Sequence, residues 1–160
     1  MANPFPFTAG QVLTAAQLNG IGEWTSYTPV LTAVTTNPNL GSTGGAVGSY
    51  ARIQNYIVYR YSIAFGGTGI SAGSGVYKVS LPVTAVQFGA FYSTVSGVSS
   101  CFDLSTFAIY NCHAWLETNT RLSLLYFPTF NGSVSNVTES APFVPATGDS
   151  YSGLVIYQAA

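Results

Sequence analysis

The sequence predicts an all-β protein, and three observations lead to this class. Short runs of alternating apolar and polar residues recur from Trp24 onward, which is the pattern of half-buried strands. Clusters of Gly, Asn, Pro and Asp separate these runs, as expected for turns. No helix pattern stands between them. We therefore expect an antiparallel β-sandwich or jelly-roll-like body over residues 23–160, preceded by an arm over residues 1–22.

The arm differs in composition from the rest of the chain. Its prolines favour an extended backbone, and Thr14 and Gln17 have the spacing of a capping box. We expect a helix of about two turns that ends at Asn19 and Gly20. So short a helix is unstable alone and has to dock on another surface. Attachment is expected through the apolar side chains of the arm, namely Pro4, Phe5, Phe7, Val12, Leu13 and Leu18.

The body contains about eight predicted strands, in the even spacing of an antiparallel fold. They cover residues 24–34, 48–53, 56–65, 76–81, 89–96, 107–116, 121–127 and 151–157. The clearest is 56–65, where Ile57, Tyr59, Tyr61, Ile63 and Phe65 alternate onto one face. Aromatic residues at this spacing predict a core face. Residues 131–148 are expected to form a long loop.

The chain is nearly uncharged. Only 6% of its residues are Asp, Glu, Lys or Arg, against about 25% in an ordinary soluble domain. The four basic residues are scattered, which argues against nucleic-acid binding, and no apolar run is long enough to insert into a bilayer. No secretory signal is found at the start. The apolar fraction of 48% indicates surface that is buried in an oligomer.

Candidate metal ligands gather around His113, the only histidine. Cys101, Asp103 and Cys112 lie near it in sequence, but the spacing matches no standard zinc site, and neighbours on a strand point to opposite faces. We expect no metal and no cofactor. The two cysteines either meet across a hairpin or remain two reduced, buried thiols, and the lack of a secretory signal favours the thiols.

Catalytic residues are equally hard to assemble from this sequence. The carboxylates Glu23, Asp103, Glu117, Glu139 and Asp149 lie in unrelated segments, whereas glycoside hydrolysis needs a pair. No G-x-S-x-G elbow is present, and the glycine-rich segments match no phosphate-binding or dinucleotide-binding pattern. We expect a protein without enzymatic activity.

Several motifs in the first half resemble those of tailed-bacteriophage virion surface proteins. Residues 7–19 match the pattern F-x-A-G-x-x-x-x-A-x-x-x-N, and residues 24–32 match W-x-x-Y-T-P-x-x-T. Residues 48–58 are similar to the hairpin that follows in such proteins, with Asn55 in place of the usual turn glycine. The sequence SLP at 80–82 is also typical. The resemblance covers residues 7–83, about half of the chain.

The resemblance implies a homotrimer in the virion, with the arm bound to the major capsid protein or to tail proteins and the β body facing outward. Because no shaft repeat follows the β body in this sequence, we expect a capsid decoration (cement) protein. The alternative is a short tail fibre or adhesin that recognises a host surface glycan. Its binding groups are then expected in the loops 66–75 or 131–148.

Overall fold

A computed structural model describes residues 10–12, 14–15, 17, 20–86, 95–128 and 133–160. It contains ten strands and no helical element in this part of the chain. The strands are β1 (Trp24–Tyr27), β2 (Leu31–Ala33), β3 (Gly45–Ile53), β4 (Tyr56–Ala64), β5 (Tyr77–Ser80), β6 (Val95–Asp103), β7 (Ala108–Thr118), β8 (Arg121–Tyr126), β9 (Ser135–Asn136) and β10 (Ser150–Gln158).

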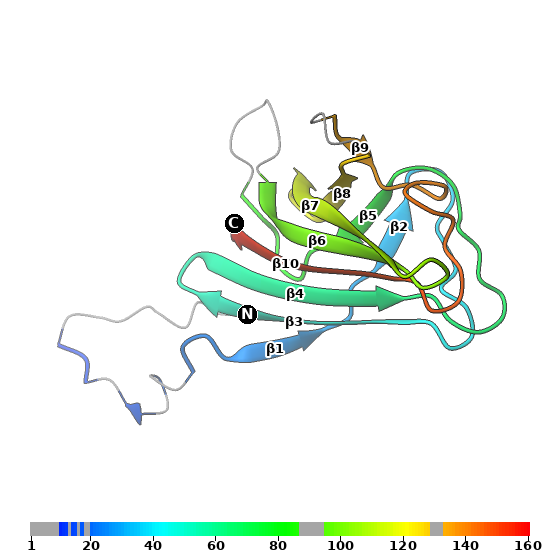
Figure 1. Ribbon diagram of the computed structural model, residues 1–160. Coiled ribbons are helices and arrows are strands. Elements are labelled where there is room, and N and C mark those ends of the chain that lie inside the picture. The colour runs from blue at the N-terminus through cyan, green and yellow to red at the C-terminus, as the bar shows by residue number, and fades with distance from the viewer. Residues whose placement is uncertain (1–9, 13, 16, 18–19, 87–94, 129–132) are drawn as a thin grey trace.

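All ten strands belong to one antiparallel sheet with the order β1-β3-β4-β10-β6-β7-β8-β5-β2, and β9 pairs with β8. The prediction of an all-β, antiparallel body is confirmed. The two edge strands, β1 and β2, are joined by only residues 28–30, so the sheet curls until its edges approach each other (Figure 1). The strand pairing gives one curled sheet, and it does not establish the finer prediction of a sandwich or jelly roll.

The two ends of the sheet are linked by tyrosine hydroxyls. The Tyr27 hydroxyl on β1 lies 2.7 Å from the Ser80 hydroxyl on β5 and donates to the Leu81 carbonyl at 3.1 Å. The Tyr59 hydroxyl on β4 donates to the Ser80 carbonyl. These bonds join β1 and β4, on one side of the strand order, to β5, which is next to last on the other side. The curled sheet thereby encloses an interior space.

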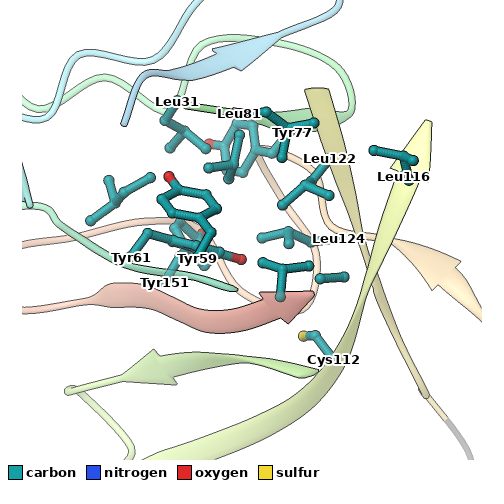
Figure 2. Close-up of a cluster of buried hydrophobic side chains, with 14 of the residues drawn as sticks. Leu31, Tyr59, Tyr61, Tyr77, Leu81, Cys112, Leu116, Leu122, Leu124 and Tyr151 are labelled. Carbon is teal, nitrogen blue, oxygen red and sulfur yellow. The ribbon is translucent and has the colours of Figure 1, made fainter. Parts of the chain in front are cut away.

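The enclosed space holds one hydrophobic core that contains tyrosine from several strands. Tyr59, Tyr61, Tyr77 and Tyr151 converge there with leucines of β2 and β8 (Figure 2). The rings of Tyr59 and Tyr61 lie 5.5 Å apart, and those of Tyr77 and Tyr151 lie 5.8 Å apart at a steep angle, as buried aromatic pairs prefer. The core face predicted for residues 56–65 is therefore confirmed.

Three elements differ from the sequence-based expectation. Pro29 has no backbone N–H, and the predicted strand 24–34 is divided there into β1 and β2. Of the predicted strand 89–96, residues 89–94 lie outside the described residues, and β6 begins at Val95 and continues to Asp103. The Ser- and Gly-rich sequence of 97–103 hides this continuation. The predicted loop 131–148 contains the short strand β9.

The β3–β4 turn also needs a correction. Ile53 pairs with Tyr56, so Gln54 and Asn55 form a two-residue turn. Gln54, and not Asn55, has the positive φ of 54° that glycine usually provides in such a turn. Its backbone carbonyl accepts a hydrogen bond from the Arg52 side chain at 2.9 Å. Within this turn, position 54 is thus the one whose backbone conformation favours glycine.

The arm is described only in part. The capping-box bonds are present: the Thr14 hydroxyl accepts from the Gln17 N–H at 3.2 Å, and Gln17 Oε1 accepts from the Thr14 N–H at 3.0 Å. The predicted helix itself is not seen as an element, although Ala15 and Gln17 each have helical backbone. Its other positions, 16 and 18–19, lie outside the described residues.

Candidate interaction surfaces

The predicted attachment residues are mostly beyond what the structure describes. Pro4, Phe5, Phe7, Leu13 and Leu18 lie outside the described residues. Val12 is described, and its side chain is 85% exposed. An apolar side chain that is so exposed among the described residues agrees with a docking role.

The outer face of β3, β4, β10 and β6 is the first candidate surface, and we call it the assembly face. Outward positions alternate with the buried tyrosines, and six large apolar side chains on them are 45–70% exposed. These six are Val47, Ile53, Tyr56, Val98, Leu154 and Ile156. Leu154 lies between Arg60 and Val98 in register, so the apolar side chains form rows across the strands.

Arg60 is the one ionised side chain that these outward rows carry on β4, β6 and β10. Its guanidinium carbon lies 4.6 Å above the Trp24 ring, and its Nε donates to the Ser49 hydroxyl at 2.8 Å. The cation is therefore held against an aromatic ring without an acidic partner at this position. The assembly face presents no carboxylate that would repel a second copy of itself.

The assembly face has ridges and hollows because rows of large side chains alternate with rows of small ones. Next to the row of Arg60, Leu154 and Val98 runs a row of Ser62, Ser152 and Ser100. The surface is hollowed between these rows over both β4 and β6. The hydroxyls of Ser100 and Ser152 lie 3.0 Å apart, which satisfies part of their hydrogen-bonding capacity. Such ridges and shallow grooves suit close packing against another β surface.

The second candidate surface is a pocket of about 320 Å³ on the outer face of β7, β8 and β9, here called the Trp115 pocket. Its lining consists of Trp115, Glu117, Ser123, Leu125, Val134 and Asn136. Trp115 lies opposite Ser123 in the β7–β8 pairing, and Leu125 lies opposite Asn136 in the β8–β9 pairing. The volume falls within the range of about 300–1,000 Å³ that is usual for small-molecule sites, as do the hollows of the assembly face at about 430 and 400 Å³, so its lining is what distinguishes this pocket.

Glu117 is the charged group of this pocket, and its carboxylate is held at both oxygens. Oε1 accepts from the Lys78 ammonium at 2.7 Å, and Oε2 accepts from the Ser123 hydroxyl at 3.0 Å. The β7–β8 register shifts between Leu116 and Thr118, so Glu117 stands at a bulge. Bulges re-aim side chains. Lys78 and Glu117 form the only ion pair found in the described part of the chain.

Of the residues weighed as metal ligands, the two cysteines come together and His113 lies away from them. Cys101 and Cys112 are free, buried thiols whose sulfurs lie 3.2 Å apart on the inner face. The hydrogen bond that they share, and then burial, raise the pKa of the Cys101 thiol. His113 lies on the outer face, with its ring 5.0 Å from that of Phe127. No group of three potential ligands is found among the described residues.

Most of the remaining carboxylates stabilise turns. Asp149 is buried and accepts from the backbone N–H groups of Leu104 and Ala146. Asp103 accepts from the hydroxyls of Ser105 and Thr106, and these bonds lower the pKa of the Asp103 carboxyl. Glu139 accepts from the backbone of Gly75. These contacts give each carboxylate a local structural role.

The loop 66–75 predicted as an alternative binding site is also well paired. Its backbone bonds to residues 36–43 at several points, including a reciprocal pair between Asn39 and Ser71. The loop therefore extends the β2–β5 ladder. The Trp115 pocket was not predicted: Trp115 and Glu117 alternate onto one face in the sequence, but Lys78 and Asn136 reach them only through the strand pairing.

Comparisons with known proteins give no relative for this chain. No protein-family model matches it, and neither a curated protein nor a solved structure is found to be similar. Among the described residues, no helix has the length and apolar character needed to cross a membrane.

Proposed function

We propose that this chain is a non-enzymatic structural protein of a tailed-phage virion, a trimeric capsid decoration protein. The observation that carries the assembly part is the assembly face, with six exposed large apolar side chains and one cation. Large exposed apolar patches mark interaction sites. The phage assignment rests on the motif resemblance of residues 7–83.

In this proposal the two parts of the chain have separate tasks. The assembly face is buried between three copies, each with a sandwich-like, curled β body. The arm of each copy, residues 1–22, holds the major capsid protein through Pro4, Phe5, Phe7, Val12, Leu13 and Leu18. Three linked arms raise the effective concentration of each remaining arm once the first has bound. Binding to the particle is therefore expected to be much tighter than binding of a single arm.

Deletion of residues 1–22 tests the task of the arm. β1 begins at Trp24, and its pairing with β3 uses residues 24–27 only, so the truncated body is expected to fold. We expect unchanged thermal unfolding and loss of sedimentation with phage particles that lack the protein. Val12→Asp is expected to weaken binding, and Val34→Asp, on an equally apolar and 62% exposed position of the body, serves as the control. Retained binding of the truncated chain would contradict the attachment role.

The second candidate function is a short tail fibre or adhesin, and the Trp115 pocket favours it. A pocket with an indole, a carboxylate and an amide fits a small polar ligand better than it fits a capsid contact. Immunogold labelling of purified particles separates the two functions. Gold over the heads supports the decoration protein, and gold confined to the tail supports the adhesin.

A further inference from the structure

The Trp115 pocket brings together kinds of side chain, tryptophan and ionised groups, that are scarce in this chain. The whole sequence has nine ionisable Asp, Glu, Lys and Arg side chains and two tryptophans. One tryptophan and the only ion pair of the described residues meet at this pocket. It lies on β7, β8 and β9, which follow the assembly face in the strand order, so both surfaces can be used together.

We propose that the Trp115 pocket binds a neutral hexose unit of a host-surface glycan. The inference rests on the second candidate function and does not need the first. The indole of Trp115 provides a flat apolar surface for the C–H face of a pyranose ring. Val134 and Leu125 supply further apolar contact, and Val134 is half exposed at the pocket rim.

The polar groups of the pocket suit sugar hydroxyls. The Lys78 ammonium and the Ser123 hydroxyl each donate a hydrogen bond to one oxygen of the Glu117 carboxylate. The carboxylate is therefore oriented before a ligand arrives, as an acceptor for hydroxyl groups. The Asn136 amide both donates and accepts. An oriented site loses less entropy on binding than a mobile one.

The charge balance of the pocket selects a neutral ligand. The Lys78 ammonium lies 2.7 Å from Glu117 and compensates its charge. An anionic sugar would meet the carboxylate, while the nearest cation is already engaged in an ion pair. A cationic ligand gains little attraction from Glu117, because the Lys78 ammonium already lies beside that carboxylate. A neutral hexose meets neither obstacle.

Intrinsic fluorescence of the full chain tests the proposal, because Trp24 and Trp115 are the only tryptophans. In Trp24→Phe the tryptophan emission comes from Trp115 alone. We expect lactose, maltose or mannobiose to change this emission saturably, and glucuronic acid and N-acetylneuraminic acid to leave it unchanged. In Trp115→Phe, which keeps Trp24, the sugar-dependent change should disappear.

Calorimetry with the best of these sugars gives the contribution of each group. We expect Trp115→Ala and Glu117→Gln each to weaken binding about tenfold or more, since 1.4 kcal/mol is tenfold in affinity. Trp24→Phe should bind as the unmodified chain does, and near-ultraviolet circular dichroism checks that each variant is folded. No binding of any neutral sugar by the folded protein overturns the proposal, as does equal binding of the acidic sugars. Either result leaves the particle location found by immunogold labelling unaffected.

Discussion

The assembly face and the Trp115 pocket lie on the same outer side of one sheet, yet their chemistry differs. On β3, β4, β10 and β6 the outward rows carry apolar side chains, serines and one cation, Arg60. On β7 and β8 they carry Trp115 and the Glu117 carboxylate, paired with Lys78 of β5. A broad apolar face suits contact with protein, whereas a pocket with oriented polar groups suits a small ligand. Because inner and outer positions alternate along each strand, the outer side chains can differ between parts of the sheet while the inner ones form one core.

Both outer surfaces depend on the same inner core. Tyr61 packs beneath the assembly face and its hydroxyl lies 2.9 Å from that of Ser99, while Leu122 and Leu124 lie on the inner side of the strand that bears Ser123 and Leu125. The cluster of buried residues is continuous from β4 through β10 to β8. The two surfaces are therefore expected to lose their shape together when the core fails.

Alkaline unfolding has the largest expected effect, because it removes both surfaces at once. Burial raises the pKa of Tyr59, Tyr61, Tyr77, Tyr151 and Tyr157 above the ordinary tyrosine value. Above about pH 10 the unfolded chain releases these protons while the folded chain retains them. The contribution of these five side chains to the free energy of unfolding is thus fully present below about pH 10, and it falls as the pH rises above that value. We expect the circular dichroism, and the part of the tyrosinate absorbance that comes from these five buried side chains, to change in one cooperative step.

The same titration sharpens the comparison between the two surfaces. Tyr59 and Tyr61 belong to β4, beneath the assembly face, whereas Tyr77 belongs to β5, beside Lys78, which pairs with Glu117 of the Trp115 pocket. Tyr77→Phe removes one ionisable group and should reduce the absorbance change without dividing the transition. Two separate transitions would show that the two sides of the sheet unfold independently, in conflict with a shared core.

Charge placed on the assembly face has the next largest expected effect. Val98 and Leu154 are neighbours in register, 63% and 45% exposed. In the double variant Val98→Asp and Leu154→Asp, association would bury two carboxylates per copy. Arg60 is the one cation of the face that could pair with them. We expect association to weaken about a hundredfold or more, since removal of a charge from water without a partner costs several kcal/mol. Sedimentation equilibrium of the unmodified chain and of the double variant measures the loss of the proposed trimer.

A matched substitution elsewhere on the surface controls for added charge alone. Val144 is 65% exposed in the segment between β9 and β10, outside both surfaces. Val144→Asp should leave the trimer intact. An unmodified chain that is monomeric at micromolar concentration, or a double variant that still forms trimers, would remove the assembly face from the proposal.

Strands were predictable from the sequence where apolar and polar residues alternate cleanly. β4 reads Tyr56–Ala64 against a predicted 56–65, and β8 reads Arg121–Tyr126 against 121–127. β6 was largely missed because its inner face holds Ser99 and Cys101 while Val98 and Phe102 lie outside, which reverses the usual hydrophobic signal. The division of 24–34 depends on the closure of the sheet, a long-range property.

The surfaces were less predictable than the strands. The assembly face follows from alternation once the inner positions of β4 are known, because the opposite positions must face outward. The Trp115 pocket depends on the pairings of β8 with β7 and β9, on the long-range pairing of β8 with β5, and on a bulge at Glu117. Lys78 and Glu117 are 39 residues apart in sequence. No local pattern in the sequence indicates such a contact between side chains of different segments.

Removal of the ion pair at the Trp115 pocket has the smallest expected effect on stability. The Lys78 and Glu117 side chains are 18% and 36% exposed, so water screens much of their attraction. Exposed pairs of this kind contribute about 0–1 kcal/mol. We expect Lys78→Met and Glu117→Gln, singly and combined in a double-mutant cycle, to lower the free energy of unfolding in urea by less than about 1 kcal/mol. A coupling well above that value would show that the pair serves to hold β5 beside β7 and β8. The chemical difference between the two outer surfaces would then reflect the needs of the sheet more than those of a ligand.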